Sequence, residues 1–385
     1  MKLLILAQGY PSPASPIAGI YHQIQFQEFA KTGADITVVI PTPYVPKGLD
    51  KVSSKWRSYK EAPYEQFDGS IRILRPRYFA LPRENKFFLP DIAQTIAIRK
   101  LGLDKPDVIL AFFALPTGAV AQNLSKQWKV PYVLSLLGDD VTVYPYLNKR
   151  NKRLFSKVMQ NASHVITNSN ALLREAKEIS GVTGEWLSIG INFSKFESLP
   201  SREECRKILN LPTDQFLLGY IGNLIEAKGI LELQNAIKTI DNSTLTTVFV
   251  GNGPLFHKIA KQQNVICVGA QPYNKIPLYM MAIDMIILPS NTEGLGMVLV
   301  EAAVTGIPCL GSDTGGISDL LKEDRGFLFP VKNSTELASQ IQYARMNPAE
   351  RDKRKRKLES FVRQNQNVIT NSKKLMDICC RVIKK

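Results

Sequence analysis

Two glutamates, Glu293 and Glu301, lie eight positions apart within the segment PSNTEGLGMVLVEAAVTGIPCLGSDTGG (residues 289–316). A Gly-Leu-Gly turn (residues 294–296) separates them and opens into an apolar run with a helical pattern. Backbone N–H groups at such a helix start are suited to bind a phosphate. We expect both carboxylates to face one cleft with the phosphate between them. This arrangement suits a nucleotide-sugar: Glu301 would accept hydrogen bonds from the ribose hydroxyls, and Glu293 from the transferred sugar.

An alternative interpretation is a surface Glu and a helix Glu in an ordinary βαβ unit with a tight turn. The glycines of the segment, the Pro-Ser before Glu293 and the Gly-Ile-Pro after the helix favour a binding site instead. The whole segment resembles the E-x7-E signature of glycosyltransferase family 4, which comprises retaining enzymes of the GT-B fold. The resemblance implies a glycosyltransferase, and it covers nearly the full chain, most strongly residues 217–330.

A second segment, YIGNLIEAKG (residues 220–229), places Lys228 near the start of a predicted helix. A departing nucleoside diphosphate gains negative charge, so a fixed cation there would lower the barrier, and removing such a group typically costs about 10²–10³ in rate. The segment resembles the family's G-R-L-x-x-x-K-G element, with Asn223 where an Arg is usual. Either Lys228 carries more of the role, or other basic residues compensate. The alternative is a capped helix start with a solvated Lys.

Glycine turns elsewhere add weaker signals. FVGNGPL (residues 249–255) resembles the family's V-G-x-G-P, although a lone G-x-G is equally typical of an ordinary strand-to-helix turn. Gly269, at the end of the next predicted strand, is placed like the residue near which the family's bases stack. In the N-terminal half, Gly19 immediately precedes a predicted helix and would let backbone approach the donor phosphate. This N-terminal pattern resembles bacterial family 4 enzymes that build teichuronic acid and other surface polysaccharides.

The segment SLLGDDVTVY (residues 135–144) follows a predicted strand and aligns with the family's H-G-x-D element. Leu137 replaces the His that contacts the donor sugar in the family. Asp139 and Asp140 are candidates to bind hydroxyl groups of the acceptor, and one of them would assist its deprotonation. Two adjacent Asp after a strand are otherwise ordinary loop residues. A paired-Asp metal site is a further alternative, but the resemblance implies that no metal or other cofactor is required.

These segments together predict the following site. The donor-binding residues are Gly19, Gly222, Asn223, Lys228, Gly253, Gly269, Glu293, Gly294, Leu295, Gly296 and Glu301. The acceptor-binding residues are Asp139 and Asp140. The catalytic residues are Lys228, Glu293 and Asp140.

The elements that must position these residues alternate between strand-like and helix-like patterns, which predicts parallel sheets covered by helices on both faces. Predicted strands are residues 2–7, 36–40, 108–112, 132–136, 164–167, 186–189, 217–221, 247–250, 265–268, 285–288, 308–310 and 326–329. Predicted helices include residues 20–31, 117–127 and 171–179. Residues 41–86 interrupt the pattern and predict a long loop or partly helical insertion.

At 385 residues the chain exceeds one ordinary core, so two domains are expected. We predict an N-terminal Rossmann-like domain over residues 1–190 that binds the acceptor, and a C-terminal one over residues 191–365 that binds the nucleotide-sugar. By resemblance to the GT-B fold, the two parallel sheets would face each other across a cleft. The last helix, within residues 366–385, would cross back onto the N-terminal domain.

Composition narrows the class of protein. Hydrophobic residues make up 44% and charged residues 22%, as in a soluble globular enzyme, and the pattern predicts no membrane-spanning segment. Five cysteines without C-x-x-C spacing predict reduced, mostly buried thiols of a cytosolic protein. Three scattered histidines disfavour a His-based metal site. The net charge of +15 predicts an anionic partner, and the chain lacks a recognised nucleic-acid motif, so we expect no nucleic-acid partner.

A basic cluster suggests where an anionic partner would lie. Lys149, Arg150, Lys152, Arg153 and Lys157 occur together without an acid. A solvated helix face is one interpretation. The other is docking on an anionic bilayer, to which each Lys or Arg would contribute about 1 kcal/mol. We therefore expect a cytoplasmic enzyme, with peripheral attachment to the inner face of the cell membrane as the second interpretation.

The sequence thus predicts a retaining hexosyltransferase. It would move a hexose-type sugar from a UDP- or GDP-sugar to a hydroxyl acceptor, a glycan or a polyprenyl-linked surface-polysaccharide precursor. Two alternatives stay open. One is a nucleotide-sugar epimerase of the same architecture, and the other is a non-catalytic partner subunit, which the Asn223 and Leu137 departures motivate.

Overall fold

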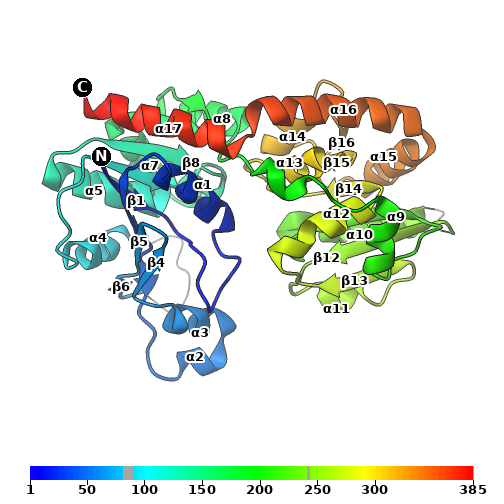
Figure 1. The fold of residues 1–385 in the computed structure, drawn as a ribbon, viewed down its shortest axis with the longest axis horizontal. Helices are drawn as coiled ribbons and strands as arrows, with labels where there is room; N and C mark the ends of the chain where they lie inside the picture. The colour runs from blue at the N-terminus through cyan, green and yellow to red at the C-terminus, as the bar shows by residue number, and fades with distance from the viewer. Residues whose placement is uncertain (81–89, 241–242, 385) are drawn as a thin grey trace. The chain divides into compact units, whose positions relative to one another are not determined.

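The structure is a computed structural model that describes residues 1–80, 90–240 and 243–384. The chain divides into two compact units (Figure 1). Unit 1 comprises Met1–Gly190 and Val368–Lys385, and unit 2 comprises Ile191–Asn367. The predicted division at residues 190 and 191 coincides with the first of these boundaries, and the second lies two residues beyond the predicted one.

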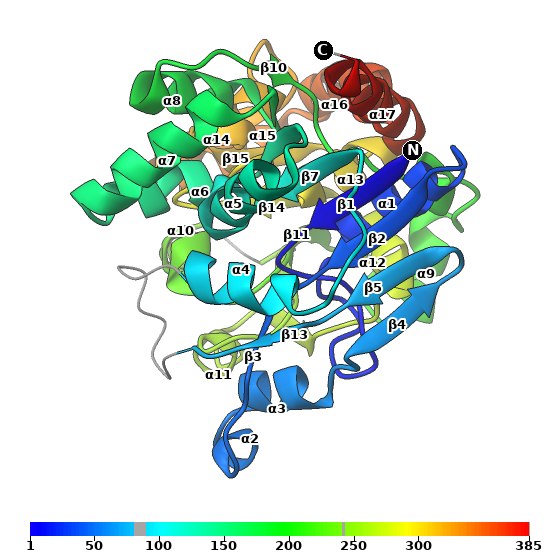
Figure 2. The same cartoon turned by 90° about the vertical axis from the view of Figure 1, so that its left-hand side faces the viewer.

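Unit 1 is built on one large sheet with the strand order β10-β9-β8-β7-β1-β2-β5-β4. The strands are β1 (Lys2–Leu6), β2 (Asp35–Val39), β4 (Glu65–Asp68), β5 (Ile71–Leu74), β7 (Val108–Phe112), β8 (Tyr132–Leu136), β9 (His164–Thr167) and β10 (Glu185–Trp186). Each neighbouring pair is parallel except β4 with β5. Figure 2 shows β1, β2, β5 and β4 as neighbours at one side of this sheet.

Helices cover both faces of the unit 1 sheet (Figure 1). They are α1 (Ile20–Ala30), α4 (Asp91–Arg99), α5 (Ala119–Trp128), α6 (Asp139–Thr142), α7 (Lys149–Asn161), α8 (Asn170–Ser180) and α17 (Val368–Ile383). Two of them, α7 and α8, begin at a capping side chain; at the start of α8, the side chain of Ser169 accepts a hydrogen bond from the backbone N–H of Leu172.

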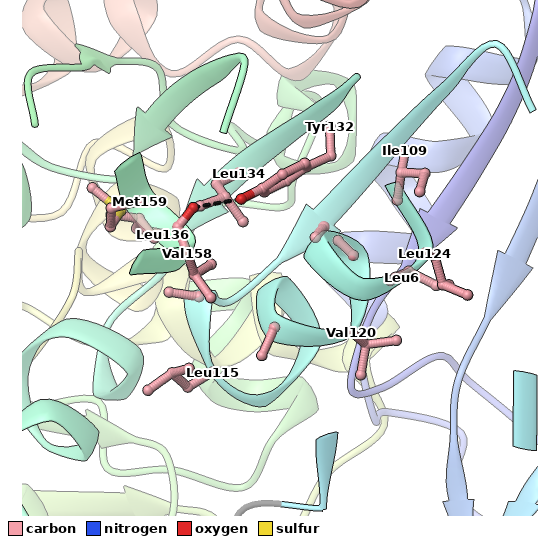
Figure 3. Packing of buried hydrophobic residues seen from close by; sticks show 14 of the residues in the cluster. Leu6, Ile109, Leu115, Val120, Leu124, Tyr132, Leu134, Leu136, Val158 and Met159 are labelled. Carbon is pink, nitrogen blue, oxygen red and sulfur yellow. Dashed lines mark hydrogen bonds between the residues drawn. The ribbon is translucent and has the colours of Figure 1, made fainter. Parts of the chain in front are cut away.

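The core of unit 1 follows from the alternation of side chains along buried strands. In β1, Leu4 and Leu6 point to the face that α5 and α7 cover, whereas Leu3 and Ile5 point to the face that α1 covers. Figure 3 shows the first of these clusters, in which the buried Tyr132 finds a polar partner: its hydroxyl donates to the carbonyl of Val158, 2.6 Å away. Burying a tyrosine without such a partner would be costly.

The last helix, α17, belongs to unit 1 although the chain reaches it after completing unit 2. Its apolar side chains, including Leu375, Ile378 and Cys379, are buried in the cluster that also contains Phe26 and Phe29 of α1. The prediction that the C-terminal helix returns to the N-terminal domain is confirmed.

The prediction for residues 41–86 was wrong for part of that segment. The segment contains helices α2 (Leu49–Val52) and α3 (Ser54–Glu61), as the helical part of the prediction implied. It also contains β4 and β5, which extend the main sheet, and a small pair formed by β3 (Thr42–Pro43) and β6 (Arg77–Tyr78). The four-residue run Ile-Arg-Ile-Leu of β5 is too short to stand out among the surrounding Pro, Tyr and basic residues. Residues 81–86 lie outside the described part of the chain.

Unit 2 has a parallel sheet with the order β13-β12-β11-β14-β15-β16. The strands are β11 (Phe216–Ile221), β12 (Leu245–Val250), β13 (Val265–Gly269), β14 (Met285–Leu288), β15 (Cys309–Ser312) and β16 (Phe327–Phe329). The helices are α9 (Arg202–Ile208), α10 (Ile230–Thr239), α11 (Phe256–Ile259), α12 (Ile276–Ala282), α13 (Met297–Val304), α14 (Gly315–Leu321), α15 (Ser334–Met346) and α16 (Pro348–Asn365). All strands are parallel, so the loops after their carboxyl ends gather at one edge of the sheet.

Across the described ranges, no helix combines the length and the apolar character needed to cross a membrane. The five cysteines carry free thiols, and Cys205, Cys309 and Cys379 among them are buried.

Candidate active site

Lys228 and Glu293 form an ion pair at the carboxyl edge of the unit 2 sheet. Lys228 ends the single turn η4 (Glu226–Lys228), which follows β11, and Glu293 lies on the loop after β14. The ammonium nitrogen of Lys228 lies 2.6 Å from Oε2 of Glu293, and the two side chains are 29% and 20% exposed. Both charges are therefore held in place yet accessible to a ligand.

Gly229 explains how these two loops meet. It has a φ of 66°, in the left-handed region that favours glycine, and it begins helix α10 directly after Lys228. A Cβ at this position would overlap the carbonyl oxygen of Pro289, so any other residue would push the loops apart. The backbone N–H of Asn291 also donates to the carbonyl of Ala227 at 3.0 Å. The pairing of Lys228 with Glu293 thus depends on a close backbone contact.

Glu293 is fixed from two further directions. The hydroxyl of Ser290 donates to its Oε2 at 3.2 Å. Its backbone carbonyl accepts a hydrogen bond of 3.0 Å from the N–H of Gly316, near the start of α14. The loop that carries Glu293 is therefore tied to the neighbouring loop after β15.

The turn between the two predicted glutamates has the geometry of an anion site. Gly296 begins helix α13 with a φ of 83°, and Gly294 and Leu295 before it are buried. The backbone N–H groups of Met297 and Val298, at the first turn of α13, have no hydrogen-bond acceptor among the residues that the structure describes. Unpaired N–H groups at a helix start, together with the helix dipole, favour a negatively charged ligand.

Glu301 lies inside α13 and is 2% exposed. Its Oε1 accepts a hydrogen bond of 2.8 Å from the hydroxyl of Tyr273, in the single turn η5 (Tyr273–Lys275) after β13. Burial, and then the charge of Glu301, raise the pKa of the Tyr273 hydroxyl, so it stays protonated and keeps donating. The ammonium of Lys195 lies 5.0 Å from the centre of the Tyr273 ring. Sequence reasoning missed Tyr273, whose role depends on a contact between distant segments.

Of the other glycines predicted to bind the donor in unit 2, Gly222 and Gly253 lie on the loops after β11 and β12, and Gly269 is the last residue of β13. Gly222 donates its N–H to the carbonyl of Val250, and Gly251 donates to Gly269, both at 2.9 Å. Gly253 follows on the loop after β12, where a side chain would overlap the carbonyl of Leu224. These loops are close enough that the predicted glycines form one backbone-lined surface.

Asn223 is exposed at this surface, and its carbonyl accepts a hydrogen bond of 2.8 Å from the hydroxyl of Tyr220. Its amide brings no charge where the family pattern has an Arg, so Lys228 is the cation that this loop contributes.

In unit 1, Gly19 begins helix α1 with a φ of 70°. A Cβ there would overlap the carbonyl oxygen of Gly9, so the two loops at the carboxyl end of β1 and the start of α1 are in direct contact. His22 supports this contact, because its Nδ1 lies 3.3 Å from the same Gly9 carbonyl. Burial lowers the pKa of His22 to about 4, and the ring is therefore neutral at pH 7.

Asp140 is closed off from solvent, whereas direct contact with an acceptor requires an accessible carboxylate. It is fully buried, and its two oxygens accept hydrogen bonds from the backbone N–H groups of Ala114, Leu137 and Gly138 at 2.8, 3.2 and 2.9 Å. Burial raises its pKa to about 6 despite these bonds. This geometry disagrees with the prediction that Asp140 contacts an acceptor or takes its proton: Asp140 holds two loops together instead.

Asp139, by contrast, is exposed at the start of α6. Burial, and then the charges of Asp139 and Asp140, raise the pKa of the Tyr144 hydroxyl. This influence places Asp139 close to Tyr144. Tyr144 is a further residue that sequence reasoning missed. It lines a cavity of about 510 Å³ in unit 1, the unit that does not contain Lys228, Glu293 or Glu301.

The basic cluster of the sequence forms one exposed surface of helix α7: Lys149, Arg150, Lys152, Arg153 and Lys157 are all exposed. On the other side of α7, Phe155 and Val158 are buried in the core. Within the described ranges, no group of three or more His, Cys, Asp and Glu side chains could hold a metal ion. That the reaction requires no metal stays a prediction from the sequence.

Comparison with known proteins places this chain among glycosyltransferases. The pattern of the family "Glycosyl transferases group 1" matches residues 201–360, and that of the "Glycosyl transferase 4-like domain" matches residues 20–185. The chain is 35% identical to TuaC of Bacillus subtilis (strain 168), over 89% of this chain and 88% of that protein, and the name of TuaC assigns it to teichuronic acid biosynthesis as a glycosyltransferase. It is 25% identical to an Escherichia coli UDP-Gal:alpha-D-GlcNAc-diphosphoundecaprenol alpha-1,3-galactosyltransferase, over 74% of this chain and 81% of that protein.

Solved structures agree in fold. A sucrose-phosphate synthase from Thermosynechococcus elongatus matches with a TM-score of 0.82 at 20% identity and covers 100% of both chains. Anabaena Alr3699/HepE in complex with UDP-glucose matches with a TM-score of 0.74 at 20% identity, over 99% of this chain and 100% of that one. These likenesses confirm the predicted GT-B fold. Together with the relatives at the sequence level, they show that the chain belongs to the group 1 glycosyltransferases and is a glycosyltransferase of the GT-B type.

Proposed function

We propose that this glycosyltransferase moves a hexose from a nucleotide diphosphate sugar, a UDP- or GDP-sugar, to a hydroxyl acceptor with retention of the anomeric configuration. The observation that carries the proposal is the Lys228–Glu293 pair, 2.6 Å apart. It lies in the loops beside the start of α13, where the N–H groups of Met297 and Val298 lack acceptors among the described residues. Cation, carboxylate and open amides together suit a pyrophosphate joined to a polyol.

In the proposed reaction, the bond between the anomeric carbon and the donor phosphate oxygen breaks, and its electron pair stays on the diphosphate. The acceptor oxygen forms the new bond on the same face, and its proton passes to the leaving phosphate oxygen. Lys228 would stabilise the charge that develops on the diphosphate, a contribution that typically amounts to about 10²–10³ in rate. Binding of the diphosphate would draw the ammonium from Glu293, which then accepts from the sugar hydroxyls.

Glu301 would hold the ribose hydroxyls through its carboxylate. Tyr273 fixes one oxygen of this carboxylate at 2.8 Å, so the carboxylate is oriented before the donor binds. In unit 1, the backbone at Gly19 would approach the donor phosphate, and exposed Asp139 would contact acceptor hydroxyls.

For the acceptor, we propose a glycan or a polyprenyl-linked precursor of a surface polysaccharide. Relatives support this class by name, one in teichuronic acid biosynthesis and one with a diphosphoundecaprenol-linked acceptor. A lipid-linked acceptor fits a cytoplasmic enzyme that docks on the inner face of the membrane. The exposed cations of α7 would provide that docking surface, at about 1 kcal/mol for each Lys or Arg near an anionic bilayer.

Proton NMR of the reaction tests the proposal. The full-length protein is incubated with a UDP- or GDP-sugar of α configuration, with and without a lipid-linked acceptor, and the anomeric signal of the new linkage is followed from the first turnover. An α linkage that forms only when acceptor is present supports retention and transfer. A β linkage contradicts retention. Conversion of the donor to a different sugar without acceptor identifies an epimerase, and an inert donor under all conditions identifies a non-catalytic subunit.

A further inference from the structure

The cavity of about 510 Å³ in unit 1 has a chemical character that the donor site does not explain. Its size is that of a site for a ligand of one or two sugar rings. Its lining contains the cations Lys55 and Arg75, the aromatic residues Trp56, Tyr59 and Tyr78, and no Asp or Glu among the described residues. A cavity with this lining favours an anionic ligand with apolar surface.

Arg75 is the buried cation of the cavity, with 2% of its surface exposed. Its guanidinium donates to three neutral carbonyls, those of Pro11, Tyr10 and Pro63, at 3.1, 3.4 and 3.4 Å. No carboxylate of the described residues forms an ion pair with it: the charged and ionisable groups that influence it are Arg77 and Tyr10. A buried charge that is solvated only by neutral groups is costly, and an anion that enters the cavity would compensate it.

Helix α3 supplies the wall of the cavity with the spacing of one helical face. Lys55, Tyr59 and Ala62 follow each other at four and three positions, with Trp56 and Ser58 beside them. The rings of Trp56 and Tyr59 meet edge to face, with centroids 6.0 Å apart.

Arg77 anchors this helix to the rest of unit 1. Its guanidinium donates to the carbonyls of Tyr59 and Ala62 at 2.6 and 2.5 Å. These bonds hold the carboxyl end of α3 beside β6, so the aromatic wall is part of the folded unit and not a loose insertion.

One polar atom in the lining, the Oε1 of Gln94, also lacks a hydrogen-bond partner among the described residues. Gln94 of α4 is 6% exposed and borders the cavity. Buried amide oxygens normally have a hydrogen-bond donor, so a ligand hydroxyl at this end of the cavity would satisfy it.

The position of the cavity relates it to the proposed transfer. Gly9 and Ala18 line it, and Gly9 is the residue whose carbonyl contacts Gly19 at the start of α1. Tyr144, near the exposed Asp139, lines it as well. The cavity is therefore adjacent, within unit 1, to the residues proposed to contact the donor phosphate and the acceptor hydroxyls.

We propose that this cavity binds an acidic saccharide as the acceptor: the sugar ring packs against Trp56 and Tyr59, and its anionic group pairs with Arg75 and Lys55. This inference rests on the proposed transferase function. The anionic group would be the carboxylate of a uronic acid or the phosphate of a sugar phosphate, because each presents two anionic oxygens that can accept both N–H bonds of a guanidinium fork.

Direct binding to the full chain tests the inference without turnover. NMR titrations use methyl β-D-glucuronide, methyl β-D-glucoside 6-phosphate and the neutral methyl β-D-glucoside, with excess UDP present to occupy the donor site. We expect at least one acidic probe to bind about tenfold or more tightly than the neutral glucoside, the effect of one charge-assisted hydrogen bond. The probe that shows the gain identifies the carboxylate or the phosphate as the anion. Equal binding of all three, or none, overturns the proposal.

Substitutions test whether the tighter binding of the acidic probe arises in this cavity. Arg75→Gln should reduce the affinity for the preferred acidic probe to that for the glucoside. Because Arg75 also ties three carbonyls, Lys55→Gln on the exposed side provides a second variant, with an expected loss of about threefold or more. Arg57→Gln is the matched control, since Arg57 is an exposed cation of α3 outside the lining. If the control loses as much affinity as Lys55→Gln, the charge of the helix and not the cavity causes the gain, and the proposal fails.

Donor binding separates this inference from the proposed function. A thermal shift with UDP-glucose or GDP-mannose in the wild type and in Lys55→Gln reports on unit 2. If the donor raises the melting temperature but the acidic and neutral saccharides bind equally, only the proposal of an acidic-acceptor cavity is refuted. If the acidic saccharide binds more tightly than the neutral one but no donor changes the melting temperature, the cavity is supported as an acidic-saccharide site. That outcome counts against the transferase proposal.

Discussion

The ammonium of Lys228 lies 2.6 Å from Oε2 of Glu293, although the two residues are 65 positions apart in the chain. Two parallel strands, β11 and β14, are adjacent in the sheet and bring the loops that follow them together. In the proposed mechanism this pair separates when the donor diphosphate binds, so each partner has a distinct expected effect on activity.

Substitution of Lys228 by Met should lower kcat by about 10²–10³, because the leaving diphosphate loses a fixed cation. Initial rates at saturating donor measure this effect. Lys238→Met is the matched control, since Lys238 is an exposed lysine in the last turn of α10 and should leave kcat unchanged. A Lys228 variant with wild-type kcat would remove this residue from the catalytic step.

Glu301→Gln should weaken donor binding by about 1.5–3 kcal/mol, since a charge-assisted hydrogen bond to the ribose is lost. Tyr273→Phe should cause a smaller loss of donor affinity. It removes the 2.8 Å hydrogen bond to Oε1 of Glu301 but keeps the negative charge of Glu301. Calorimetric titration with the donor measures both. Glu203→Gln is the control, as Glu203 is 69% exposed on α9. Unchanged donor affinity in Glu301→Gln would exclude Glu301 from the site.

The raised pKa of Asp140 predicts that the stability of the protein depends on pH. This pKa of about 6 in the folded protein lies above the ordinary 3.8, so between these values the folded state binds the proton more tightly than the unfolded state. The free energy of unfolding should therefore fall as pH rises from about 4 to 6, by roughly 3 kcal/mol from this group, and stay level above. In Asp140→Asn this part of the slope should vanish. Urea unfolding at pH 4, 5, 6 and 8, in both proteins, gives the difference.

The same variant separates a structural role from a catalytic one. The Asn amide cannot accept from all three backbone N–H groups that Asp140 satisfies, so Asp140→Asn should also lose about 1–3 kcal/mol of stability at pH 8. Its kcat in the folded fraction should remain within a few-fold of the wild type. A loss of kcat by orders of magnitude in a protein that stays folded would restore Asp140 as a catalytic residue.

The basic surface of α7 can be tested on vesicles. Replacing Lys149, Arg150, Lys152 and Arg153 by Gln should weaken binding to vesicles that contain phosphatidylglycerol, by up to about 1 kcal/mol per charge at low salt. Sedimentation at several salt concentrations measures it. The control replaces the four cations Lys353, Lys355, Arg356 and Lys357 of α16 and removes the same charge. Equal losses in both variants would show that net charge, and not the α7 surface, drives binding.

Much of the fold could be predicted because buried parallel strands are continuous apolar runs. The strands at Val108–Phe112, Tyr132–Leu136 and Met285–Leu288 have the predicted bounds. β4 and β5 were missed, since Ile71–Leu74 contains an Arg and lies among basic and aromatic residues. In such a segment the apolar pattern is too short to separate an edge strand from a loop.

The candidate site was predictable where function depends on local geometry. The Gly-Leu-Gly turn before α13 can be inferred from its spacing, and Gly296 does begin that helix. Long-range contacts left no local signal: Tyr273 and Glu301 are 28 positions apart, with helix α12 and strand β14 between them in the chain. Asp140 illustrates the opposite error, since a carboxylate after a strand gives no indication whether water or three backbone amides will surround it.

The proposed function depends above all on unit 2 binding an activated sugar through its diphosphate. The most direct measurement is calorimetric titration of the full-length protein and of Lys228→Met with UDP-glucose, GDP-mannose and ADP-glucose. We expect that one UDP- or GDP-sugar binds the wild type with a defined affinity and that Lys228→Met binds it clearly more weakly. Failure of every donor to bind, or an affinity that is the same in both proteins, would contradict the proposed function.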